Sequence, residues 1–120
     1  MKRTLVLLVV AAAALGAGAS AGAGRSPAQA TLLARVNVAA SEFKFVLSKK
    51  TAHRGVVIFK VKNVGKLGHD FEIKGRKTRV LSPGQSATLR VTFLSKGHYP
   101  YKCTVPGHAA AGMKGVFTIT

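Results

Sequence analysis

The sequence is poor in cysteine and in acidic residues. Among its 120 residues, Cys103 is the one cysteine, and Glu42, Asp70 and Glu72 are the three acids. One cysteine excludes a disulfide within the chain. Three carboxylates argue against glycoside hydrolysis and against a Mg²⁺ or Ca²⁺ site, because both need paired or clustered carboxylates. The acids face 19 Lys and Arg residues, which gives a formal net charge of +16.

The first thirty residues have the order of an export signal. Met1-Lys2-Arg3 is a short basic head, Leu5–Leu15 is unbroken apolar sequence, and small residues with A-x-A sites follow. This order predicts a signal peptide and short linker over residues 1–30, cleaved at about 21–30, before a domain over residues 31–120. Because the apolar stretch approaches the roughly 20 residues of a membrane span, a retained N-terminal anchor is the alternative.

Export has a consequence for the lone thiol. We expect the protein in the periplasm or outside the cell, soluble after cleavage. Small exported domains usually gain stability from disulfides or from a metal. A single cysteine cannot form a disulfide within the chain, and a free thiol is prone to react in an oxidising compartment. The sequence therefore predicts that another group binds the thiol of Cys103.

Apolar and polar residues alternate along most of the domain, which is typical of half-buried strands. Turn-forming residues separate the runs, and no stretch of ten or more residues in the domain has a helical period. The pattern predicts an all-β sandwich or small barrel of about seven or eight strands. The alternating runs are 35–40, 43–48, 57–62, 71–74, 87–93, 99–103 and 116–120.

Metal-ligand residue types cluster near the C-terminus. Cys103, His108 and Met113 stand in the pattern C-x4-H-x4-M, and His69 is expected to open a strand over 69–73. Two imidazoles, a thiolate and a thioether are the ligands of a blue-copper site, where His₂Cys forms a plane and Met is a weak axial ligand. Zn²⁺ is an alternative occupant of a Cys-His-His set. Taken singly, each residue fits an ordinary structural role, and only the set of four points to a metal.

Turn residues support the same interpretation. Pro106-Gly107 lies between Cys103 and His108 and is expected to turn the chain, while Gly112 lets the loop close before Met113. The two other histidines of the domain, His53 and His98, are expected at the surface and outside the site.

Residues 34–120 resemble the cupredoxins, the small type 1 blue copper proteins that include plastocyanin, azurin and auracyanin. The resemblance implies a Greek-key β-sandwich with one copper ion at one end, held by His69, Cys103, His108 and Met113. Asp70 departs from the Asn of several members, and a carboxylate directed inward there would lower the reduction potential. The resemblance is carried by 59–65, His69-Asp70-Phe71, Pro83-Gly84, 97–103 and the loop through Gly115.

The resemblance implies a one-electron carrier between redox partners and no enzymatic activity, since no open coordination position or general base is visible. His108 is the expected exit for the electron, within an apolar docking face. A periplasmic copper carrier or buffer is the alternative, and a domain of a larger copper enzyme is a third possibility. The docking face is expected to contain Val105, Pro106, Ala109, Ala110 and Ala111.

The positive charge predicts the partners. Without Lys2, Arg3 and Arg25, 16 basic residues remain against three acids, a net charge of +13. This charge either keeps the protein soluble or steers it toward redox partners with acidic docking surfaces or toward an anionic envelope surface. No base-reading motif is present, so nucleic acid is not expected as a partner, and we expect a monomer.

Overall fold

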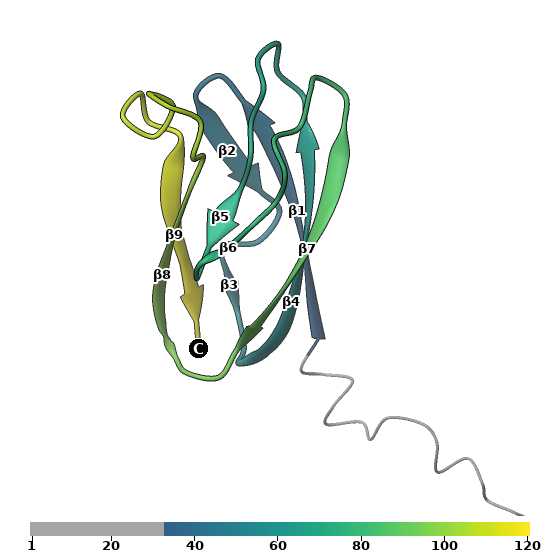
Figure 1. Cartoon of the computed structure of the whole chain (residues 1–120). Helices are drawn as coiled ribbons and strands as arrows, with labels where there is room; N and C mark the ends of the chain where they lie inside the picture. Colours follow the sequence, from purple (N-terminus) through teal and green to yellow (C-terminus); the bar gives the residue numbers. More distant parts are fainter. Residues whose placement is uncertain (1–32) are drawn as a thin grey trace, which may run out of the picture.

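A computed structural model of the chain describes residues 33–120, which form nine strands in two sheets (Figure 1). The signal peptide predicted over residues 1–30 lies outside the described residues. The first sheet has the order β2-β1-β4-β7 and the second the order β3-β9-β8-β5-β6. The strands are β1 (Leu33–Ser41), β2 (Lys44–Leu47), β3 (Thr51–Ala52), β4 (Gly55–Asn63), β5 (Glu72–Ile73), β6 (Arg76–Lys77), β7 (Ser86–Phe93), β8 (Gly97–Lys102) and β9 (Lys114–Ile119).

Each sheet joins strands that are distant in the sequence. In the first sheet β1 runs parallel to β4, and β4 is antiparallel to β7. In the second sheet β8 is antiparallel to both β5 and β9. The β8–β9 loop and the β4–β5 connection consequently lie at the same end of the sandwich, opposite the C-terminus (Figure 1). These two segments contain all four predicted ligands.

The alternation of the strands produces the core. In β4, Val57, Phe59 and Val61 are fully buried, while Lys60 between them is exposed. The ring of Phe59 lies 5.3 Å from that of Phe117 in the opposite sheet, so aromatic contacts join the two layers. Each such buried side chain contributes about 1.5–3 kcal/mol relative to an exposed one.

The predicted all-β sandwich is confirmed, with three local differences. The strands β3 and β6 have two residues each and are too short to show alternation. The strand expected from His69 begins only at Glu72. The chain turns at Glu42 and Phe43, so Phe43 is 39% exposed and does not continue the buried face of β2. Residues 33–120 contain no helix able to cross a membrane.

Candidate metal centre

Cys103 directly follows β8, whose last residue, Lys102, pairs with Lys114 of β9. The backbone N–H of Cys103 donates to the carbonyl oxygen of Met113 at 3.1 Å, which extends the pairing of the two strands by one step. The Cys103 side chain is 1% exposed and packs with Met113 and Ala40 in a small apolar cluster. The two predicted sulfur ligands are thus fixed together at the end of one hairpin.

The loop between β8 and β9 folds back on itself and holds His108. The N–H of His108 donates to the carbonyl of Val105 at 3.1 Å, and the carbonyl of His108 accepts the N–H of Met113 at 3.1 Å. Gly107 and Gly112 have φ angles of +83° and +115°, which residues with a side chain rarely adopt. The turns predicted at both glycines are confirmed.

His69 lies in the connection between β4 and β5. Its N–H donates to the carbonyl of Leu81 at 3.1 Å and its carbonyl accepts the N–H of Leu81 at 2.7 Å, which makes an isolated β-bridge. The side-chain amide of Asn63 donates to the carbonyls of Leu67 and Leu81 at 2.7 and 2.8 Å. These contacts fix the backbone on both sides of His69, whose side chain is fully buried.

The side chains of His69, Cys103 and His108 converge. Nδ1 of His69 lies 3.1 Å from Nδ1 of His108, and Sγ of Cys103 lies 3.6 Å from the same Nδ1. One potential ligand atom from each of the three residues lies within 4.8 Å of the others. Two ring nitrogens and a thiol sulfur, without a carboxylate, suit copper or zinc better than magnesium or calcium. Three predicted ligands are brought together directly, and Met113 packs against Cys103 beside them.

The surroundings of Cys103 act on its thiol in opposite directions. Burial raises the pKa of Cys103, while hydrogen bonds from the backbone N–H groups of Asp70 and Val105 lower it less strongly. The negative charge of Asp70 adds a further increase. A metal ion therefore has to displace a proton from the sulfur, and the two N–H groups are already in place to stabilise the thiolate that results.

Glu42, between β1 and β2, contacts the centre and was not predicted as part of it. Its Oε1 accepts the ring Nε2–H of His69 at 2.9 Å and the N–H groups of Lys66 and Leu67 at 2.8 and 2.7 Å. Hydrogen bonds from Leu67 and then His69 lower the pKa of Glu42 to about 2, so the carboxylate is ionised at neutral pH. Glu42 is 27 residues from His69 in the sequence. The one feature that could have drawn attention to it is that the sequence has only three acidic residues.

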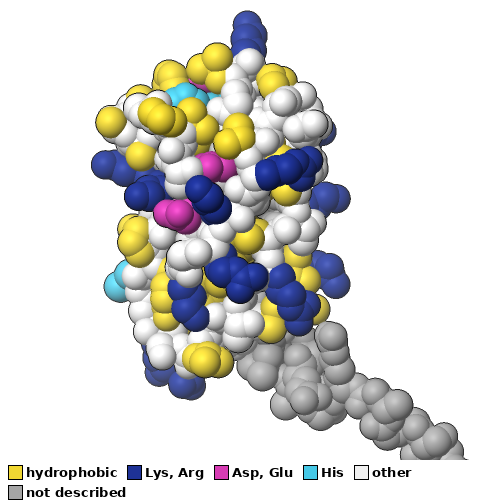
Figure 2. Space-filling model, viewed as in Figure 1, with side chains coloured by type: hydrophobic (Ala, Val, Ile, Leu, Met, Phe, Trp, Pro, Cys, Tyr) yellow, Lys and Arg dark blue, Asp and Glu magenta, His cyan; other side chains and the backbone are white. Residues whose placement is uncertain are grey.

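His108 is the predicted ligand with the greatest exposure. It is 9% exposed, whereas His69 and Met113 are fully buried. The ring of Phe43 packs edge-on against that of His108 with 5.1 Å between ring centroids. Figure 2 shows hydrophobic side chains gathered with histidine at this end of the molecule, while most Lys and Arg in view lie along the body. The apolar surface around His108 therefore includes Phe43, which the sequence pattern had placed in a strand over 43–48.

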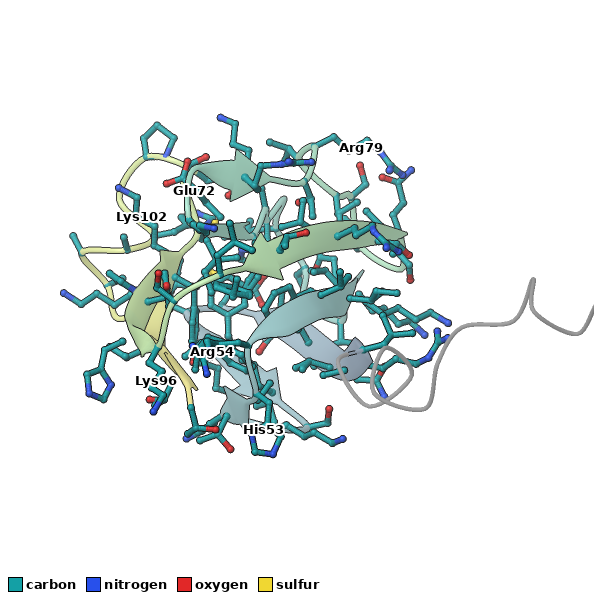
Figure 3. All side chains as sticks on the ribbon, turned by 90° about the horizontal axis from the view of Figure 1, so that it is seen from below. His53, Arg54, Glu72, Arg79, Lys96 and Lys102 are labelled. Carbon is teal, nitrogen blue, oxygen red and sulfur yellow. The ribbon has the colours of Figure 1, made fainter. Side chains whose placement is uncertain are left out.

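The two remaining histidines of the described residues lie outside the centre, as predicted. His98 is exposed on β8, where its Nδ1 lies 3.1 Å from the hydroxyl oxygen of Thr118. His53 is exposed, and its Nδ1 lies 3.0 Å from the hydroxyl oxygen of Thr120. Figure 3 views the molecule from the end opposite the centre and shows His53 there at the periphery. Neither residue belongs to the cluster of His69, Cys103 and His108.

A β-sandwich with a buried His, Cys and His together at one end has the geometry of a metal-binding protein. Residues 31–120 match the family of copper binding proteins, plastocyanin/azurin family. The chain therefore belongs to the plastocyanin/azurin family of copper-binding proteins, and copper is its cofactor.

Individual relatives are similar over different lengths. Auracyanin-B of Chloroflexus aurantiacus is 44% identical over 43 residues, which are 36% of this chain and only 18% of the relative. The structure of a dithionite-reduced auracyanin from the photosynthetic bacterium Roseiflexus castenholzii superimposes with a TM-score of 0.60 at 24% identity, covering 81% of this chain and 99% of that chain. A copper-containing nitrite reductase from Thermus scotoductus has a TM-score of 0.57 at 17% identity, over 72% of this chain and 27% of the reductase. At these identities the two structures show the fold.

Proposed function

We propose that this chain is an exported type 1 copper protein that carries single electrons between redox partners. His69, Cys103, His108 and Met113 would hold the copper ion through two ring nitrogens, a thiolate and a thioether. The observation that carries the proposal is the convergence of two Nδ1 atoms and one Sγ within 4.8 Å in a buried site. A copper ion bound by these residues would supply one-electron chemistry between its Cu(I) and Cu(II) states.

The chain contributes rigidity to this function. The backbone bonds Cys103 N–H to Met113 and Met113 N–H to His108, both 3.1 Å, hold three ligands in one short loop. The β-bridge to Leu81 holds His69 independently. A ligand set fixed in this way rearranges little when the charge of the metal changes by one, so the barrier to electron transfer stays low.

The surface supports electron transfer to a partner through the His108 ring. It is the most exposed of the four ligands, and residues 104–113 around it carry no charged side chain. A small neutral contact suits a short-lived encounter, while the basic body attracts partners with acidic docking surfaces. We propose a monomer that meets such partners with this end. The apolar face consists of Phe43, Val105, Pro106, Ala109, Ala110 and Ala111.

Export is part of the proposal and rests on residues 1–30. Their basic head, apolar segment and A-x-A sites support cleavage at about 21–30, with release to the periplasm or the cell exterior. N-terminal sequencing of the mature protein tests this. A chain that begins at Met1 and stays with the membrane fraction would support the retained anchor instead.

A copper carrier or buffer would use the same ligands but must release the metal. Full burial of His69 and Met113 favours retention, so we place electron transfer first. Two measurements separate the functions. An electron carrier should give a reversible voltammetric wave without loss of copper. A copper carrier should transfer its copper readily to a chelator or an acceptor protein.

Visible spectroscopy tests the ligand assignment. The copper-loaded protein should show an intense thiolate-to-copper band that Cys103→Ser removes completely. His98→Ala, which changes an exposed histidine of β8, is the matched control and should keep the band. An intense band that survives in Cys103→Ser would refute the proposed centre.

A further inference from the structure

The carboxylate of Glu42 joins two parts of the molecule at His69. Its Oε1 accepts the N–H groups of Lys66 and Leu67 at 2.8 and 2.7 Å, and the same oxygen lies 2.9 Å from Nε2 of His69. The Glu42 side chain is 27% exposed and that of His69 is fully buried. One carboxylate therefore holds both the loop that precedes His69 and the far edge of its ring.

This contact determines which ring nitrogen of His69 carries the proton. A carboxylate only accepts hydrogen bonds, so Nε2 must be the protonated nitrogen. Nδ1 then keeps its lone pair, and Nδ1 is the atom that lies 3.1 Å from Nδ1 of His108. A hydrogen bond to the second nitrogen of a metal-binding histidine fixes its tautomer and its orientation and makes it a stronger donor.

The neighbouring loop leaves room for this carboxylate. A Cβ atom at Gly65 would lie 2.5 Å from Oε1 and 2.7 Å from Oε2 of Glu42. The oxygen of the Asn63 side chain accepts the N–H of Gly65 at 2.9 Å and fixes the turn at this position. The close approach of the carboxylate to the backbone thus depends on the missing side chain at Gly65.

We propose that Glu42 is a positioning residue of the copper centre, which aims Nδ1 of His69 at the metal and lowers the reduction potential through its negative charge. The inference rests on the proposed function, since it takes His69 as a ligand. A negative charge hydrogen-bonded to a ligand stabilises Cu(II) more than Cu(I). Its removal should therefore weaken Cu(II) binding more than Cu(I) binding and raise the potential.

Glu42→Gln tests the proposal because it keeps the size of the side chain and removes the charge. The amide oxygen of Gln can still accept the N–H groups of Lys66 and Leu67 and the Nε2–H of His69, so this variant isolates the effect of the charge. The matched control is Glu72→Gln, which makes the same change in charge on β5. In the second sheet Glu72 lies opposite Lys102 of β8 and Lys77 of β6 in the strand register. Figure 3 labels Glu72 and Lys102.

We expect Glu42→Gln to weaken Cu(II) binding by about 10- to 100-fold in competition with a chelator. The loss of Cu(I) binding should be smaller, and each tenfold difference raises the midpoint potential by about 59 mV for a one-electron couple. Glu72→Gln should change both affinities less. Equal potentials in the two variants would overturn the proposal.

¹⁵N NMR of the metal-free protein gives a second readout that does not depend on copper. We expect the neutral His69 ring to carry its proton on Nε2 in the natural protein and to lose this preference in Glu42→Ala, which removes the acceptor. A proton on Nδ1 in the natural protein would overturn the positioning role. If that tautomer is found as expected but the Cys103-dependent visible band is absent, the proposed function fails and the Glu42 contact stands.

Discussion

Asp70 and Thr104 tie the two ligand-bearing segments together. Oδ1 of Asp70 accepts the backbone N–H of Thr104 at 2.6 Å, and Oδ2 accepts the Thr104 hydroxyl. Asp70 is 2% exposed and follows His69, while Thr104 follows Cys103. The acidic side chain of Asp70 is thus engaged by Thr104, and its backbone N–H is available to Cys103.

Replacing Asp70 should therefore destabilise the metal-free protein. Asp70→Ala removes two hydrogen bonds to a charged group and leaves the N–H of Thr104 without its acceptor, at a cost of about 2–3 kcal/mol in the free energy of unfolding. Urea denaturation followed by circular dichroism measures it. Thr104→Ser keeps both donors and should cost far less; an equal loss in the two variants would contradict this explanation.

Asn63 should contribute comparably to stability. It is fully buried, and its amide joins the carbonyls of Leu67 and Leu81 on either side of the β-bridge to His69. Asn63→Ala leaves both carbonyls without this donor, so we expect a loss of about 2–4 kcal/mol in denaturant unfolding. The control is Asn37→Ala on the exposed face of β1, which should change the unfolding free energy by less than about 0.5 kcal/mol.

Gly115 in β9 lies opposite Tyr101 in β8 and has no room for a side chain. An added Cβ would lie 2.2 Å from the hydroxyl oxygen and 2.4 Å from Cζ of Tyr101, which is buried. Gly115→Ala should cost about 1–3 kcal/mol, because the ring must move within a packed core. The cost should fall in a Tyr101→Leu background, since Leu is too short to reach the added carbon. Fully additive effects would exclude the clash as the cause.

The sequence predicted the parts of the centre that depend on residue type and short spacing. Cys103, His108 and Met113 are neighbours in the chain, and a turn at Pro106-Gly107 suffices to bring them together. His69 was found by type, because few histidines were available. Its surroundings could not be predicted, since Glu42 reaches it from a turn 27 residues away and no periodic pattern records such a contact.

The same limit explains the differences in the fold. Alternation predicted β1, β4 and β7 well because each spans eight or nine residues, enough for the period to repeat. In Phe43 an aromatic residue matched the alternation, but the chain turns there and the ring packs on His108 instead. The pattern therefore gave the layers correctly, and tertiary contacts decided where individual strands begin.

Removal of copper should lower stability without unfolding the sandwich. The large core around Phe59 and the backbone bonds of the ligand loop do not depend on the metal. A metal that binds only the folded chain stabilises it by about 4 kcal/mol at 1,000 times its dissociation constant. Calorimetry with and without copper should show two cooperative transitions, with the metal-free one at lower temperature. Identical transition temperatures, or a metal-free chain without β-structure by circular dichroism, would contradict this expectation.

Association with an acidic redox partner should depend on where a positive charge lies. Lys66 is exposed beside the centre in the β4–β5 connection, and Lys96 is exposed in the turn before β8, at the end of the molecule seen in Figure 3. If the partner docks at the apolar face around His108, Lys66→Glu should reduce the association rate about tenfold at low salt. Lys96→Glu makes the same change in net charge and should have a much smaller effect.

Stopped-flow kinetics at several ionic strengths measures the association rates of both variants. The difference between them should shrink above about 0.1 M salt, where the screening length falls to about 10 Å. Equal rates for the two variants would mean that only the overall charge attracts the partner, and would contradict docking at this end.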